Sequence, residues 1–127
     1  TYNIAEIQQN DYHNELDFTQ SGDSNRLTVD QNGFGGRISG SSTGSGNSVD
    51  IAQSFMSNQA TVIQNGNDNL ASIEQGNYGH QATITQLGSA NEAMIRQSLP
   101  ANDFTRLPGV ATIHQSGTGN SATIVQQ

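Results

Sequence analysis

Hydrophobic and polar residues alternate along this chain in runs of seven, and each run is followed by four residues typical of turns. Two such runs read NELDFTQ and NQATVIQ, and alternate residues of each run would share one face. Strict alternation is the period-two pattern of a β-strand with one buried face. The pattern therefore predicts strands that bury Asn, then Ala or Leu, then a β-branched or aromatic residue, and finally Gln.

This unit recurs every eleven residues over nearly the whole chain, and a fixed short period is typical of a repeat architecture. Most units have glutamine at their seventh position, and Ser42 replaces it in one unit. The predicted glutamine column is Gln9, Gln20, Gln31, Gln53, Gln64, Gln75, Gln86, Gln97, Gln115 and Gln126. The predicted core column is Ile7, Phe18, Val29, Ile51, Val62, Ile73, Ile84, Ile95, Ile113 and Ile124.

An asparagine opens most units, and a glycine follows two residues after most of the glutamines. Glycine tolerates the positive φ that a tight turn requires, so we expect these glycines to form the turns between strands. The predicted asparagine column is Asn3, Asn14, Asn25, Asn47, Asn58, Asn69, Asn91 and Asn120. The predicted arch turns contain Gly22, Gly33, Gly44, Gly66, Gly88 and Gly117.

A strand of this length cannot bury its own apolar face, so each unit needs a partner in a second sheet. The simplest solution is a β-arch, in which odd units form one sheet and even units form the other. Two units then make a 22-residue coil, and coils stack in register, about 4.7–4.8 Å apart, as an all-β solenoid with two parallel sheets. Buried Asn and Gln amides would be costly alone but can hydrogen-bond along the stack as ladders, as in cross-β structures.

One domain of eleven strand units is expected over residues 3–127, with two irregularities. Residues 98–108 lengthen the spacing and contain Pro100 and Pro108, which suit an inserted loop. The unit over 36–46 has Gly40 at the core position, so we expect this strand to be underpacked by one aliphatic side chain. The same register places Glu15 one layer from Arg37 and Glu74 one layer from Arg96.

Composition excludes several classes of function. The net charge of -7, without any lysine, argues against direct binding of nucleic acid. The chain has no cysteine and no apolar run long enough to span a membrane. The carboxylates are spread along outward positions and the histidines lack partners for a metal site, so we expect no catalytic, cofactor or metal site and no enzyme. These residues are Glu6, Asp30, Asp50, Glu74, His13, His80 and His114.

The repeat resembles the curlin repeat of curli, an extracellular bacterial amyloid. The family pattern Ser-x5-Gln-x4-Asn-x5-Gln is present here in a relaxed form, for example in Asn47-x5-Gln53-x4-Asn58-x5-Gln64. The resemblance covers nearly the whole chain. The given sequence does not show the secretion-targeting segment expected at the N-terminus, as in a trimmed or a divergent member, and the 98–108 loop is atypical. The final unit, NSATIVQ, has no basic residue, which is more similar to the major subunit than to the minor one.

The resemblance implies a structural subunit of a fibre at the bacterial cell surface, with a role in biofilm matrix and adhesion. It also implies two partners besides the chain itself, which are a nucleating minor subunit and an outer-membrane secretion system. Because neither end of the repeat array looks capped, we expect head-to-tail polymerisation by templated strand stacking.

A monomeric ice-binding solenoid is the alternative. The predicted column for it is Ser39, Thr61, Thr83 and Thr112.

Overall fold

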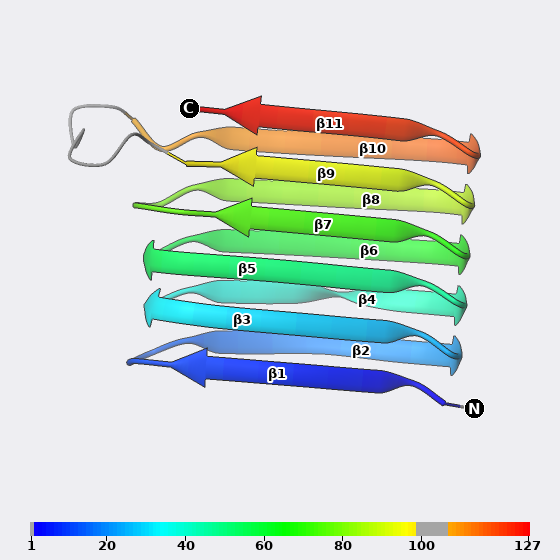
Figure 1. The fold of residues 1–127 in the computed structure, drawn as a ribbon, viewed down its shortest axis with the longest axis horizontal. Helices are drawn as coiled ribbons and strands as arrows, with labels where there is room; N and C mark the ends of the chain where they lie inside the picture. The colour runs from blue at the N-terminus through cyan, green and yellow to red at the C-terminus, as the bar shows by residue number, and fades with distance from the viewer. Residues whose placement is uncertain (1, 99–106) are drawn as a thin grey trace.

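The computed structural model describes residues 2–98 and 107–127, which form two β-sheets lying face to face (Figure 1). Successive strands along the chain alternate between the two sheets. The described residues contain no helix. The strands are β1 (Ile4–Asn10), β2 (Glu15–Asp23), β3 (Arg26–Phe34), β4 (Arg37–Ser45), β5 (Ser48–Met56), β6 (Gln59–Asn67), β7 (Leu70–Gln75), β8 (Gln81–Ser89), β9 (Glu92–Gln97), β10 (Val110–Thr118) and β11 (Ser121–Gln126).

Both sheets are parallel and in register. One sheet has six strands in the order β1-β3-β5-β7-β9-β11, and the other has five in the order β10-β8-β6-β4-β2. Gln31 lies opposite Gln53, and hydrogen bonds link residues 22 positions apart along the stack. The predicted β-solenoid of stacked 22-residue coils is therefore confirmed. The insertion expected at 98–108 falls mainly on residues 99–106, which lie outside the described residues.

The core is a thin double layer of aliphatic side chains between the sheets. Two columns supply it, one at the expected β-branched position and one at the alanine or leucine position two residues earlier. Ile7, on the outer strand β1, is 51% exposed, while Phe18 and Ile124 are partly buried. The buried residues include Leu27, Val29, Ile38, Val49, Ile51, Ala60, Val62, Ala71, Ile73, Ala82, Ile84, Ala93, Ile95, Ala111 and Ile113.

The gap expected at Gly40 is absent. A β-carbon added there would lie 2.9 Å from Cε2 of Phe18, so the Phe18 ring occupies the space that an aliphatic side chain would fill. Ile38 on the same strand is completely buried. The prediction that this strand is underpacked was wrong, because the missing side chain is replaced from the neighbouring layer.

Each turn that is fully described carries two residues with positive φ, where the sequence predicted one. The first follows two residues after the glutamine position, as at Gly22 with a φ of 102° and Asn77 with a φ of 73°. The second lies two residues further on, and it includes Ser24 at 58° and Ala90 at 54°. Serine and alanine carry no compositional signal for this conformation, so the sequence did not reveal the second position.

The outward-facing charges agree with the register. Arg37 Nη2 lies 2.6 Å from Glu15 Oε2, and Arg96 Nε lies 2.8 Å from Glu74 Oε2. Both neighbour relationships were predicted from the 22-residue coil and are confirmed. All four side chains are more than half exposed, so each pair is worth at most about 1 kcal/mol.

Candidate functional site: the stacked amide columns

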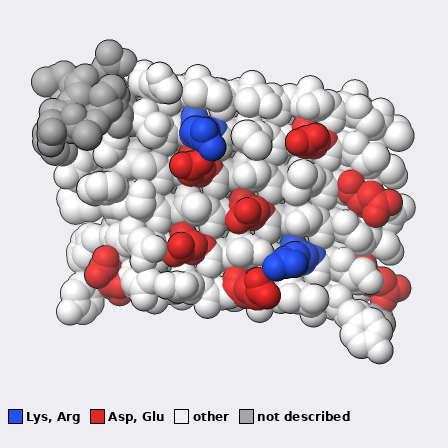
Figure 2. Space-filling model, in the orientation of Figure 1, with Lys and Arg blue, Asp and Glu red and all other residues white. Residues whose placement is uncertain are grey.

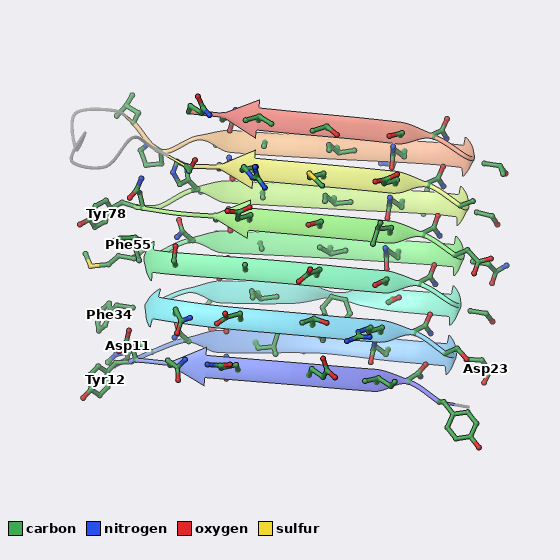
Figure 3. All side chains as sticks on the ribbon, in the orientation of Figure 1. Asp11, Tyr12, Asp23, Phe34, Phe55 and Tyr78 are labelled. Carbon is green, nitrogen blue, oxygen red and sulfur yellow. The ribbon has the colours of Figure 1, made fainter. Side chains whose placement is uncertain are left out.

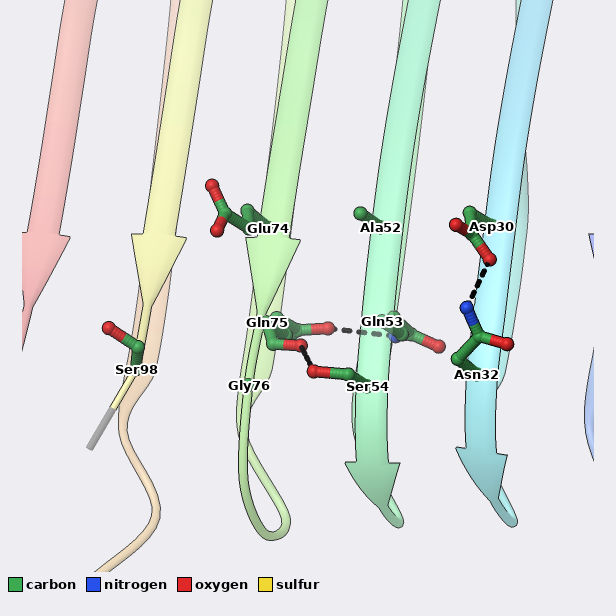
Figure 4. Close-up of a pocket in the computed structure, with 9 residues that line it drawn as sticks. All are labelled: Asp30, Asn32, Ala52, Gln53, Ser54, Glu74, Gln75, Gly76 and Ser98. Atoms are coloured by element: carbon green, nitrogen blue, oxygen red, sulfur yellow. Dashed lines mark hydrogen bonds between the residues drawn. The ribbon is translucent and has the colours of Figure 1, made fainter. Parts of the chain in front are cut away.

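Glutamines of the same sheet are linked from layer to layer by side-chain hydrogen bonds. Gln53 Nε2 donates to Gln75 Oε1 at 2.7 Å (Figure 4), and Gln75 Nε2 donates to Gln97 Oε1 at 3.0 Å. Each amide thus accepts from one layer and donates to the next. The chain in the six-stranded sheet links Gln9, Gln31, Gln53, Gln75, Gln97 and Gln126, and that in the five-stranded sheet links Gln64, Gln86 and Gln115.

The same amides also join the two sheets. Gln75 Nε2 donates its second hydrogen to the carbonyl of Gln59 on β6 at 2.9 Å, and Gln86 Nε2 donates to the carbonyl of Leu70 on β7 at 2.9 Å. Gln75 and Gln86 are almost completely buried. A buried glutamine here satisfies its polar atoms along the stack and across it, which removes the usual cost of burying an amide.

The column changes where Ser42 replaces glutamine. Ser42 Oγ donates to Gln64 Oε1 at 3.2 Å and so continues the contact upward. Gln20, in the layer below Ser42, keeps the bond to the other sheet but is not joined to another glutamine amide. With its amide oriented to satisfy both atoms, Gln20 donates to the Ile4 carbonyl at 3.2 Å and accepts from the Leu27 N–H at 3.1 Å. The structure therefore places Gln20 between the sheets and outside the chain of glutamine amides.

The asparagine column acts mainly on the backbone. Asn47 Oδ1 accepts the Asn69 N–H at 3.0 Å in the next layer, and Asn47 Nδ2 donates to the carbonyls of Thr43 at 3.1 Å and Gly66 at 2.8 Å. Asn69 Nδ2 also donates to Asn47 Oδ1 at 3.1 Å. Each asparagine thus holds the end of one turn and the start of the next strand. Backbone clamping of this kind was missed from the sequence, which predicted amide ladders alone.

The described members of this column share the same geometry. The N–H acceptors are Asn3, Asn14, Asn25, Asn47, Asn58, Asn69 and Asn91, and Asn120 bonds to Asn91 at the top of the stack.

His80 replaces asparagine in this column and is 2% exposed. Its Nδ1 accepts the Gly109 N–H at 2.9 Å, as an asparagine Oδ1 would. Nε2 is buried without a hydrogen-bond partner within the described part of the chain. Burial lowers the pKa of His80, although backbone groups of Gly109 and Gly76 act in the opposite direction. The neutral ring is therefore the form that the fold favours.

On the part of the outer surface that residues 2–98 and 107–127 form, no reactive groups come together. Figure 2 shows carboxylates spread over the face of the six-stranded sheet, with basic side chains among them. A shallow groove of about 200 Å³ on this face is lined in part by Asp30, Ser54 and Glu74 (Figure 4). Its carboxylates already have partners, because Asp30 accepts from Asn32 at 2.8 Å and Glu74 pairs with Arg96. No group of metal-ligating side chains occurs among residues 2–98 and 107–127.

None of the described residues belongs to a helix long and apolar enough to cross a membrane.

A family model, the curlin-associated repeat, matches residues 44–76. This segment contains three asparagine and three glutamine positions of the two columns and spans β5, β6 and β7. The match supports membership of the curlin-repeat family. Neither the curated proteins nor the solved structures contain a match to the chain.

Proposed function

We propose that this chain is a structural subunit of an extracellular amyloid fibre of the curli type, which grows by templated stacking of strands. The observation that supports this proposal is the register of the strands, because residues of one type lie over one another from layer to layer. Ile51 pairs with Ile73 and Ile73 with Ile95, while Gln53, Gln75 and Gln97 align beside them. Any layer built in this way presents the hydrogen-bonding pattern and apolar surface that the next layer requires.

The outer strands provide a surface on which a further layer can form. Within the described residues, β1 pairs only with β3 and β11 only with β9. Ile4 and Ile7 on β1 are 49% and 51% exposed, so apolar side chains accompany the unpaired backbone groups. Exposed edges of this kind favour addition of another strand. We propose that a second copy stacks there head to tail, a contact that does not close on itself.

Curli-type fibres are extracellular, so we place this subunit in a fibre at the bacterial cell surface, with a role in biofilm matrix and adhesion. The family resemblance supports a nucleating minor subunit and an outer-membrane secretion system as partners, and the proposal assigns this chain the major-subunit role. The repeat family and the solenoid fold suggest a structural protein without enzymatic activity.

The ice-binding alternative is not favoured. Ser39, Thr61 and Thr83 do align on the outer face of the five-stranded sheet. The column beside them contains Ile63 and His114 in place of threonine. That face is therefore too irregular to order water as a lattice.

Assembly is tested by diluting the purified chain from denaturant and following fibre formation by electron microscopy. We expect fibres whose diffraction shows spacings of about 4.7–4.8 Å and about 10 Å. Sonicated fibres should remove the lag phase of fresh chain, because growth is templated. A chain that stays monomeric when seeded would contradict the proposal, and thermal hysteresis of that monomer would restore the ice-binding alternative.

A further inference from the structure

The two turn-bearing edges of the solenoid differ in chemistry, and the difference follows one sequence position. This position lies three residues after each glutamine position. After β1, β3, β5 and β7 it holds a large apolar or aromatic residue, whereas after the even-numbered strands it holds a small polar one. The apolar set is Tyr12, Phe34, Met56 and Tyr78, and the polar set is Asp23, Ser45, Asn67, Ser89 and Thr118.

The apolar residues lie in a row along one edge. Figure 3 shows Tyr12, Phe34, Phe55 and Tyr78 on the same edge, with Asp23 on the opposite one. The Phe55 and Tyr78 rings are 6.4 Å apart between centroids, and Met56 pairs with Tyr78 through a parallel bridge. We call Tyr12, Phe34, Phe55, Met56 and Tyr78 the edge stripe.

The edge stripe exposes apolar surface that the fold does not need. Tyr12, Phe55 and Phe34 are 72%, 58% and 47% exposed, and Met56 is 44% exposed. The corresponding turns on the other edge are built with Ser, Asn and Asp, so turn geometry does not require large side chains. A contiguous exposed apolar patch on a soluble protein is typical of an interaction site.

Charge decides which partner suits this edge. The chain carries a net charge of -7, and carboxylates outnumber arginines on the outer face of the six-stranded sheet. Two copies that met through this face would bring like charges together, whereas Asp11 is the one carboxylate in the described turns that carry the edge stripe. The face carries Glu6, Asp30, Asp50, Glu74 and Glu92, against Arg26 and Arg96.

We propose that the edge stripe is the lateral contact between two fibres of this chain, stripe against stripe. The inference rests on the proposed fibre function. Both partners have the same layer spacing, so their apolar residues can meet repeatedly along the axis.

The area that two edge stripes can bury explains when this contact forms. Five part-exposed side chains bury on the order of a few hundred Å². A stable interface buries about 800 Å² on each partner, so single subunits would not pair through the edge stripe. In a fibre the stripe repeats with every subunit, and many weak contacts between two long partners add up. Fibres should therefore elongate first and associate laterally afterwards.

The test replaces the stripe with residues that the chain itself uses at the same position on the other edge. The stripe variant combines Tyr12→Ser, Phe34→Ser, Phe55→Gly, Met56→Asn and Tyr78→Ser, with glycine at 55 because the other edge has glycine at that position of its turns. A matched control exchanges polar residues on the opposite edge, as Ser45→Asn, Asn67→Ser and Ser89→Asn. Seeded elongation rate and filaments per bundle are measured for both variants and for the unmodified chain, at low and high NaCl.

We expect the unmodified chain and the control to form bundles that thicken with NaCl, since salt screens the acidic faces. The stripe variant should elongate at a similar rate but carry about threefold fewer filaments per bundle, or none beyond single filaments. Equal bundling by the stripe variant would overturn the inference. Unmodified fibres that stay single at every salt concentration would also overturn the inference, and this result is expected if the edge stripe binds a polysaccharide. If the unmodified chain forms no fibres at all, the proposed function itself fails.

A second variant keeps the inference testable if the stripe variant does not fold. Ser45→Phe, Asn67→Met and Ser89→Tyr add a stripe to the polar edge while leaving the original one intact. Fibres with two stripes should associate on both edges and form broad sheets. Bundles of unchanged width would count against lateral contact through these turns.

Discussion

The ring of Phe18 on β2 lies against the backbone of Gly40 on β4, its direct partner in the next layer. Away from Phe18 and Gly40, an aliphatic side chain of the core column lies over another aliphatic side chain, as with Ile73 and Ile95. Here one residue is larger than the pattern and its neighbour is smaller. The two departures compensate, so the thin core stays filled at constant layer spacing.

Restoring a side chain at Gly40 should therefore destabilise the fold, although most units carry one there. A β-carbon at Gly40 would lie 1.9 Å from the Val62 carbonyl oxygen as well as 2.9 Å from Phe18 Cε2. We expect Gly40→Ala to lower the free energy of unfolding by about 3 kcal/mol or more, since backbone atoms cannot move aside cheaply. Urea denaturation followed by circular dichroism measures this.

Gly119→Ala is the matched control for that substitution. Gly119 also has a positive φ, at 71°, but a β-carbon there meets nothing within 4 Å. We expect Gly119→Ala to lower the free energy of unfolding only by the backbone cost of about 1–2 kcal/mol. Similar losses for Gly40→Ala and Gly119→Ala would show that the close contacts of Gly40 with Val62 and Phe18 add nothing to the backbone cost.

The glutamine ladder makes a separate prediction about stability. Gln75→Met keeps the approximate volume but removes the donor to Gln97 and the acceptor for Gln53. Three polar groups lose a partner, which are Gln53 Nε2, Gln97 Oε1 and the part-buried Gln59 carbonyl, and a buried group left unpaired costs about 1–3 kcal/mol. We expect the solenoid to unfold at much lower urea and fibre growth to slow. Gln81→Met, on the exposed side of β8, is the control and should change the urea midpoint little. Equal changes for Gln75→Met and Gln81→Met would argue against the ladder.

The sequence was sufficient for the architecture because identical residues recur at one spacing. Gln53, Gln75 and Gln97 can align only if the coil contains 22 residues, and that spacing fixes the register of both sheets. The ion pair between Glu15 and Arg37 then follows from the same count. Period and register were therefore predictable without any knowledge of packing.

What the sequence did not reveal depends on neighbours that only folding brings together. Gly40 looked like a gap because Phe18 is 22 positions away and belongs to another layer. Gln20 lies outside the glutamine ladder because its partner in the next layer is Ser42 and not a glutamine. The alternation of apolar and polar turns was readable in the sequence, but its meaning required the knowledge that alternate turns lie on opposite edges.

His80 predicts a specific dependence of stability on pH. Burial holds the pKa of His80 below its ordinary value of about 6.5, so the unfolded chain binds a proton more readily than the folded one. The stability contributed by neutral His80 is present above the unfolded pKa and is lost as the pH falls through the lower folded value. Protonation at Nδ1 would also remove the acceptor for the Gly109 N–H.

Urea midpoints measured between pH 7.5 and pH 4.5 test this dependence. In His80→Asn, the asparagine oxygen can accept the Gly109 N–H and has no charge to gain, so the loss at acid pH should be smaller than in the unmodified chain. The exposed His114 supplies the control, since His114→Asn should leave the pH profile unchanged. Identical profiles for the unmodified chain and His80→Asn would exclude His80 as the source.

Phe55 combines backbone strain with exposure, and the two effects can be separated. Its φ of 70° is a conformation that costs a bulky residue about 1–2 kcal/mol, whereas Asn77 holds a similar φ in the next layer of the same edge. We expect Phe55→Asn to raise the free energy of unfolding by about 0.5–1 kcal/mol, because relief of this strain outweighs an exposed contact with Tyr78. Phe34→Asn is the matched control, because Phe34 lies on the same edge without a positive φ. This substitution should not raise the free energy of unfolding. If both variants lower stability equally, the conformation of Phe55 carries no strain, and its side chain is retained for packing alone.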